Sequence, residues 1–96
     1  MANYELMFIV NPNLSEEEKT TSIDNLKTIL EKFSAKVEKE EVIGEQKLAY
    51  KINKSTTGFY VLMDLEMNGE EIKNISKEIN LVSKNIWRYM FTKKEA

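Results

Sequence analysis

The sequence predicts an α+β fold in which two helices cover one face of a four-stranded antiparallel sheet. Two periodicities predict it. Four segments alternate between apolar and polar residues, or are apolar on both faces, as strands are. Two longer segments repeat apolar residues at helical spacing. With 96 residues, 42% of them hydrophobic, we expect a single domain over residues 1–96 with one modest core.

The first predicted strand covers residues 4–10. It is apolar on both faces, which favours a central position in the sheet. One of its faces carries Leu6, Phe8 and Val10. A turn is expected at residues 11–13.

The first predicted helix covers residues 15–32. Ser15 and Glu18 have the spacing of a capping box, in which each side chain bonds to the backbone N–H of the other residue. Acidic side chains in the first turn also suit the positive end of the helix dipole. The apolar stripe of this helix comprises Ile23, Leu26, Ile29, Leu30 and Phe33.

Residues 35–43 and 47–52 are expected to be two halves of one long, bent edge strand, with a bulge or bend at Gly44. The second half alternates strictly, which predicts a half-buried strand with a basic outer face. Leu48, Tyr50 and Ile52 should point to one side, and Lys47, Ala49 and Lys51 to the other. A hairpin loop is expected at residues 53–57.

Gly58 opens a strand over residues 59–67, whose odd-numbered residues should face the core. A second helix over residues 70–82 and a last strand over residues 86–92 follow, and residues 93–96 form a short polar tail. The order β-α-β-β-α-β predicts a ferredoxin-like arrangement with both helices on one face and the strand order 4-1-3-2.

Composition excludes several classes of function. The chain has no cysteine and no histidine, which removes thiol chemistry, the commonest zinc ligand and histidine-based catalytic triads. Catalysis by carboxylates alone remains possible, but spacing singles out no carboxylate pair, and we expect no cofactor, metal or small-molecule substrate. The longest apolar run, residues 6–10, is too short for a bilayer, and the first residues lack the regions of a signal peptide. We therefore expect a cytoplasmic protein without membrane contact.

The segment Gly44-Glu45-Gln46-Lys47-Leu48-Ala49-Tyr50-Lys51-Ile52 carries a glycine and a basic residue before Leu-Ala-Tyr. It resembles the signature of the bacterial small-subunit ribosomal protein six family. Further blocks fall, in order and spacing, where that family has similar ones: Tyr4-Glu5, Asn11-Pro12-Asn13-Leu14, Gly58-Phe59-Tyr60 and Ile86-Trp87-Arg88-Tyr89. The resemblance covers essentially the whole chain. It implies a structural protein of the small ribosomal subunit, not an enzyme, that binds the central domain of its ribosomal RNA together with small-subunit ribosomal protein eighteen.

The chain departs from the family pattern at several positions. Gln46 stands where the family usually has a basic residue, and Lys51 where many members have proline. Ala2 and Asn3 replace arginines that some relatives carry at the start. The absence of a basic residue at position 46 and at positions 2 and 3 reduces phosphate contacts, which suggests that this member depends more on its protein partner for affinity.

The net charge of −2 gives no overall attraction to phosphate, so RNA binding must come from local clusters of bases. The expected RNA-binding residues are Lys47, Lys51 and Lys54 on the hairpin and Arg88, Lys93 and Lys94 on the last strand and tail. In a regular strand Lys47 and Lys51 would stand about 13 Å apart, within reach of phosphates on one backbone. Arg88 should matter most, because a guanidinium pairs with phosphate in two places and stacks on bases.

The sheet face without helices should carry an apolar patch. The expected contacts with a protein partner are Met7, Ile9, Tyr60, Leu62 and Met90. A small protein rarely leaves such a patch bare. Either a partner docks there, which the resemblance implies to be small-subunit ribosomal protein eighteen, or the long second strand or the tail folds partly across it.

Other functions occur on this fold and leave alternatives. An RNA-recognition domain stacks bases on aromatic residues of the open face, whereas Phe8 and Phe59 lie on the same face as the most apolar residues and should therefore face the helices. A ligand-binding regulatory domain favours a glycine-rich turn after the first strand, which residues 11–14 lack. The remaining alternative is a stand-alone ferredoxin-like domain that regulates or oligomerises through its open face.

Overall fold

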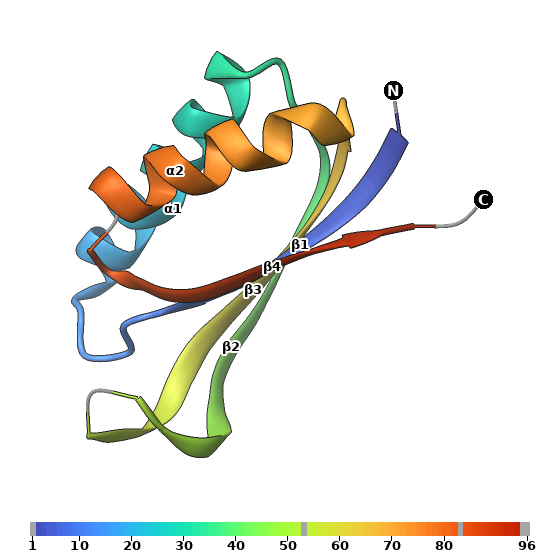
Figure 1. Cartoon of the computed structure of the whole chain (residues 1–96). Helices are drawn as coiled ribbons and strands as arrows, with labels where there is room; N and C mark the ends of the chain where they lie inside the picture. Colours follow the sequence, from blue (N-terminus) through green and yellow to red (C-terminus); the bar gives the residue numbers. More distant parts are fainter. Residues whose placement is uncertain (1, 53, 83, 95–96) are drawn as a thin grey trace.

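The computed structural model describes residues 2–52, 54–82 and 84–94, and its elements follow the predicted order (Figure 1). They are β1 (Ala2–Val10), α1 (Glu16–Lys32), β2 (Lys36–Ile52), β3 (Ser55–Met67), the 3₁₀ helix η1 (Gly69–Glu71), α2 (Ile72–Val82) and β4 (Ile86–Lys93). Asn53 of the expected loop and residues 95–96 of the expected tail lie outside the described residues. No helix in the described ranges is long and apolar enough to span a membrane.

The four strands form one antiparallel sheet in the order β2-β3-β1-β4. This is the predicted order read from the opposite edge, so the predicted topology is confirmed. β1 is central, as its two apolar faces predict, and β2 and β4 are the edges. Both α1 and α2 lie on one side of the sheet (Figure 1), which leaves the opposite face, called the open face below, without a helix.

The main core lies between the sheet and the two helices, and its composition confirms the predicted faces of the strands. Alternate residues of β1 and β3 enter it, together with one stripe from each helix. Its buried members are Leu6, Phe8, Val10, Ile23, Leu26, Ile29, Leu30, Ala35, Val61, Met63, Leu65, Met67, Ile75, Ile79 and Ile86. Phe59, also expected there, is half-buried at the rim, with Lys19 Nζ 4.7 Å from the centre of its ring.

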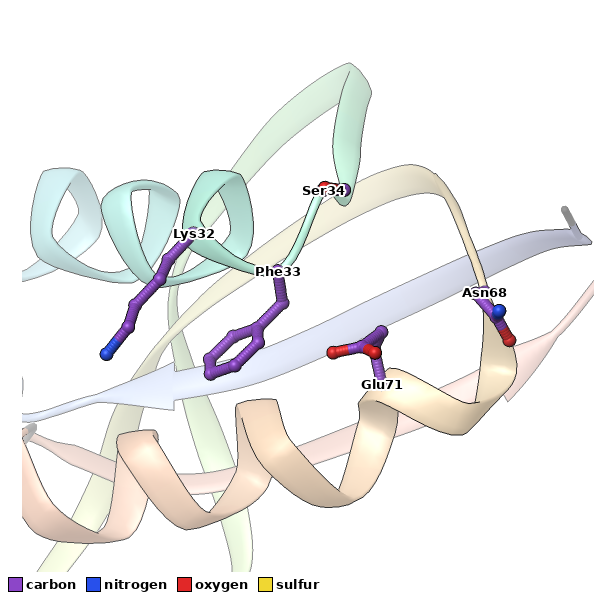
Figure 2. Close-up of a pocket in the computed structure, with 5 residues that line it drawn as sticks. All are labelled: Lys32, Phe33, Ser34, Asn68 and Glu71. Carbon is purple, nitrogen blue, oxygen red and sulfur yellow. The ribbon is translucent and has the colours of Figure 1, made fainter.

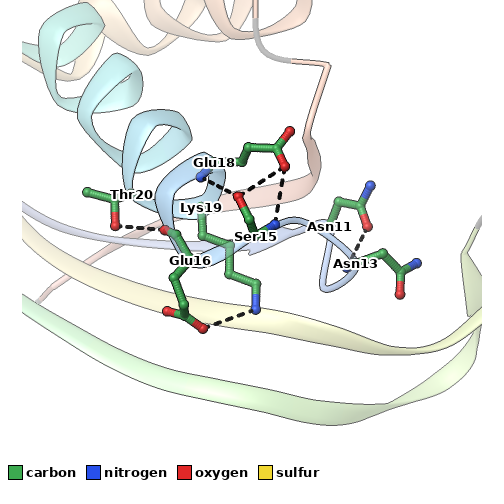
Figure 3. Close-up of polar contacts among 7 residues, drawn as sticks. All are labelled: Asn11, Asn13, Ser15, Glu16, Glu18, Lys19 and Thr20. Carbon is green, nitrogen blue, oxygen red and sulfur yellow. Dashed lines mark hydrogen bonds and ion pairs between the residues drawn. The ribbon is translucent and has the colours of Figure 1, made fainter.

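The start of α1 is closed by the predicted capping box (Figure 3). Ser15 Oγ accepts a hydrogen bond from the Glu18 N–H at 3.2 Å, and the Ser15 N–H donates to Glu18 Oε1 at 3.3 Å. Ser15 is therefore the N-cap, as the capping-box spacing predicts, and the helix itself begins at Glu16.

The end of α1 is closed by backbone hydrogen bonds alone. The N–H of Ser34 donates to the Glu31 carbonyl at 3.0 Å, and the N–H of Ala35 donates to the Leu30 carbonyl at 2.9 Å. This is the Schellman pattern, which needs a left-handed residue after the C-cap. Ser34 takes that conformation, with φ of 61°.

The second helix begins with one 3₁₀ turn rather than directly as the predicted α-helix. Asn68 caps this turn, because its Oδ1 accepts the Glu70 N–H at 3.0 Å. Gly69 lies so close to Tyr4 that a Cβ at this position would collide with the phenol oxygen. The α-helix proper starts at Ile72.

The pairing of β2 with β3 is irregular in three places, of which the first lies between Val37 and Lys39. The register shifts between Val42 and Gly44, and Gly44 has φ of 98°, which confirms the predicted bulge. The third irregularity, between Lys47 and Ile52, contradicts the prediction. β3 begins at Ser55, so the expected loop is shorter, and residues 48–51 of β2 oppose Thr56 alone. A bulge of this kind breaks the strict alternation expected at the end of β2.

Candidate nucleic-acid interface

Three lysines mark the far end of the β2–β3 hairpin, which extends from the sheet on the side away from the helices (Figure 1). Lys47, Lys51 and Lys54 are all exposed. Lys54 lies in the turn and has a left-handed backbone, with φ of 67°. Within the described residues, none of the three forms a salt bridge. Their charges are therefore available to an outside anion. The bulge removes the regular spacing from which the separation of Lys47 and Lys51 was expected.

A small apolar cluster attaches the hairpin to the open face. Leu48 and Ile52 of β2 pack with Ile9 of β1, and these side chains are 8%, 7% and 6% exposed, respectively. Tyr60 and Trp87 are half-buried against them. We call Ile9, Leu48 and Ile52 the clamp.

The clamp corrects one expectation about the protein-partner surface. Ile9 was expected on a bare patch, but it is buried because the long second strand folds across this part of the sheet. Gly58 permits this contact. A Cβ at Gly58 would collide with Ile9 and lie 3.2 Å from Leu48 Cδ2. Of the two explanations offered for the patch, coverage by the second strand is correct at this end of it.

Tyr50 is the hairpin residue that sequence reasoning placed wrongly. Alternation put it on the same side as Leu48 and Ile52, yet its side chain is 69% exposed. The bulge at the end of β2 is the reason, since the pairing skips this position. An aromatic residue between Lys47 and Lys51 was the available sequence signal that this position could be a candidate for binding.

Arg88 lies beside the clamp on β4. Its register partner on β1 is Ile9, and at the next step Val10 pairs with Ile86, which makes Trp87 the extra residue of a bulge. Arg88 is exposed, and its Nη1 donates to the carbonyl oxygen of Trp87 at 2.9 Å. The guanidinium is thus held near the backbone of its own strand with donors left for another acceptor.

The two lysines that end the last strand do not share one face. Lys93 pairs with Tyr4, whose side chain packs against the main core. Lys94 lies on the opposite side, where its Nζ is 3.0 Å from Asp64 Oδ1. Successive residues of a strand point to opposite faces, so the expected second group of bases is divided. Arg88 is the member of that group placed at the clamp.

Three of the expected protein contacts form a row across the open face. Met7 pairs with Leu62 on one side and with Met90 on the other. Met90 is 54% exposed, and the other two side chains are half-buried. We call Leu62, Met7 and Met90 the apolar strip. Tyr60, expected in the same patch, packs instead against the clamp.

A charged depression of about 210 Å³ borders the apolar strip. Glu5 and Asp64 lie directly opposite each other on β1 and β3, an unfavourable pairing of like charges that the Lys94–Asp64 ion pair offsets. The depression is lined by Glu5, Lys39, Glu41, Leu62, Asp64 and Lys94. Its mixed charge contrasts with the purely basic hairpin end.

A second hollow, of about 330 Å³, lies on the helix side between the end of α1 and η1 (Figure 2). It is lined by Lys32, Phe33, Ser34, Asn68 and Glu71. Lys32 is already paired with Glu78 at 2.9 Å. In the described part of the chain no polar or charged side chain is buried, and no three potential metal ligands come together. The candidate binding side chains of the described residues are therefore those of the hairpin, Arg88 and the apolar strip.

Known proteins match this chain over nearly its whole length. Residues 3–93 match the family model described as Ribosomal protein S6. The small ribosomal subunit protein bS6 of Fusobacterium nucleatum is 34% identical over 95 residues, which cover 99% of this chain and 100% of that protein. The protein of the same name from Halalkalibacterium halodurans is 35% identical, with 99% of each chain covered.

Solved structures agree with this match. The crystal structure of 30S ribosomal protein S6 from Thermotoga maritima superposes with a TM-score of 0.87 at 29% identity, over 97% of this chain and 87% of that one. The P2 domain of the chemotaxis kinase CheA, also from Thermotoga maritima, superposes with a TM-score of 0.60 at 13% identity and shares the fold alone.

Proposed function

Because the chain belongs to the ribosomal protein S6 family, we propose that it binds the central domain of the small-subunit ribosomal RNA together with small-subunit ribosomal protein eighteen. The relatives are structural ribosomal proteins, so this chain is a constituent of the small subunit in the cytoplasm and not an enzyme. Membership leaves the stand-alone regulatory domain without support.

One observation carries the RNA half of the proposal: exposed cations gather at one end of a protein whose net charge is negative. The clamp attaches the segment with Lys47 and Lys51 to β1 at the residue that pairs with Arg88. Two basic elements far apart in sequence are thereby brought together. Contacts of this kind go mostly to phosphate and sugar, so they recognise the shape of RNA more than its sequence.

The apolar strip supports the protein half. It faces outward from a sheet surface that carries no helix (Figure 1), and Met90 at its edge is largely exposed. Methionine side chains adapt their shape to a partner, and exposed apolar groups gain from being covered. We assign this strip to small-subunit ribosomal protein eighteen and the hairpin with Arg88 to RNA.

The test is filter binding of a central-domain transcript at physiological salt, with and without the partner protein. We expect weak binding by this protein alone, because its few phosphate contacts are offset by its acidic balance, and much tighter binding when the partner is added. Tight binding of the transcript by this protein alone, unchanged when the partner is added, would contradict the proposal.

A charge placed on the apolar strip separates the two halves. Met90→Glu should abolish the gain from the partner while leaving the weak solitary binding nearly as it is. Leu81→Glu is the matched control, because Leu81 is an exposed apolar residue, 69% accessible, on α2 rather than on the open face. Equal effects of both substitutions would remove the strip from the partner interface.

A further inference from the structure

We propose that Tyr50 stacks on an unpaired RNA base, which makes the hairpin an aromatic as well as an electrostatic contact. The inference rests on the proposed function, because it takes the same RNA as its ligand. The RNA contacts expected from the sequence are lysines and one arginine, so the inference adds an aromatic residue to them.

The first argument is the exposure of the ring within a segment that otherwise buries its apolar side chains. Tyr50 is 69% exposed, while Leu48 and Ile52, two positions away on either side, are 8% and 7% exposed. Burying an aromatic ring stabilises a fold by more than burying most side chains. The chain nevertheless places its smaller neighbours in the clamp and leaves the ring in water.

The second argument is the way the ring is held. Leu48 and Ile52 both pack on Ile9, so the backbone that carries Tyr50 is attached to the sheet on both sides of it. A side chain on an anchored segment loses less freedom on binding than one on a free loop. The exposed ring is therefore held in a fixed place on the surface, where a ligand can contact it.

The third argument is the charge around the ring, which decides between RNA and a protein as its partner. Residues 46–63 contain the three hairpin lysines and no aspartate or glutamate. Such a segment attracts a polyanion and repels a basic protein. Aromatic side chains beside cations are the usual means of holding single-stranded RNA, since every base offers a face for stacking.

The experiment compares Tyr50→Leu and Tyr50→Phe in binding of the central-domain transcript, with the partner protein present, across a salt series. Removing a stacking ring should weaken binding about 5- to 140-fold and leave the slope of log affinity against log salt unchanged. Phenylalanine keeps the ring and should bind as the wild type does. Lys51→Ala is the contrasting variant, because loss of a phosphate contact should lower the slope by about one.

Two controls exclude trivial effects. Leu81→Ala removes an equally exposed apolar side chain from α2 and should leave RNA binding unchanged. Because Tyr50 is exposed, Tyr50→Leu should keep the wild-type unfolding midpoint.

Several results would overturn the inference. Wild-type affinity of Tyr50→Leu would mean that the ring touches no base, and a reduced salt slope would mean that its loss displaces the lysines. Weaker association of Tyr50→Leu with the partner protein in the absence of RNA would assign the ring to the protein interface. If the wild-type protein and partner fail to bind the transcript at all, the proposed function fails as well, so the two failures are distinguishable.

Discussion

The two faces of the sheet are built from the same strands yet hold different kinds of cluster. On the helix-covered face, alternate residues of β1 and β3 join side chains from α1 and α2 in the main core. On the open face the only buried cluster of the described residues is the clamp, made by β1 and β2 alone. The comparison separates stability from positioning. The main core decides whether the chain folds, and the clamp decides where the hairpin lies.

The largest expected effect breaks the main core. Leu65→Ala or Leu26→Ala should lower the free energy of unfolding by about 2–5 kcal/mol, because each removes a fully buried side chain between helix and sheet. Leu48→Ala should cost clearly less, since the hairpin can relax toward solvent. Chemical denaturation measures all three. A loss at Leu48 as large as that at Leu65 would show that the clamp and the main core are one cooperative unit.

Gly58→Ala should lift the hairpin off the open face. The added Cβ collides with Ile9, and overpacking of this kind costs about 1–3 kcal/mol. Hydrogen exchange should show loss of protection at the end of the hairpin while β1 keeps its own. In an Ile9→Ala background the cost of Gly58→Ala should shrink, because the colliding side chain is gone. Equal costs in both backgrounds would mean that the contact with Ile9 is not the constraint.

Arg88→Ala tests the open face as a binding surface. It should weaken partner-assisted RNA binding by about 1–3 kcal/mol with a nearly unchanged unfolding midpoint, because Arg88 is exposed. Lys47→Ala, Lys51→Ala and Lys54→Ala should each cost less, since lysines are point charges that substitute for one another. Filter binding across a salt series is the measurement. Normal assembly of Arg88→Ala together with failure of Lys47→Ala would move the RNA surface entirely to the hairpin.

The smallest effects are expected at two residues with a left-handed backbone, one at the end of α1 and one in the turn of the hairpin. Ser34 and Lys54 have φ of 61° and 67°, a conformation that glycine adopts without strain. Ser34→Gly at the end of α1 should raise the unfolding free energy by up to about 1 kcal/mol and leave RNA binding unchanged. Lys54→Gly should give a similar gain in thermal unfolding but lower RNA affinity. Identical RNA affinities for both variants would exclude Lys54 from the contact.

Much of the fold follows from local pattern in the sequence. The alternation of Leu6, Phe8 and Val10 predicts the buried face of β1, and the Ser15–Glu18 spacing predicts the start of α1, because both depend on neighbours in the chain. The bulge at Gly44 is predicted for the same reason.

The site is less predictable because it depends on contacts between distant segments. The burial of Ile9 requires the hairpin to fold back, and no residue near Ile9 in the sequence indicates this. The exposure of Tyr50 results from a register skip that strict alternation hides. The pairing of Lys94 with Asp64 likewise arises only when the last strand lies beside β1 and near β3.

Trp87 is the only tryptophan of the chain, and it is half-buried against the clamp. Indole fluorescence shifts to longer wavelength when the ring becomes exposed to water, so the emission of this protein reports on a single place, the seat of the hairpin. The main core, which contains no tryptophan, contributes nothing to that signal. The molecule thus carries an intrinsic optical probe of the hairpin that needs no label: a shift of the indole emission while the far-UV circular dichroism keeps its native value would report lifting of the hairpin without global unfolding.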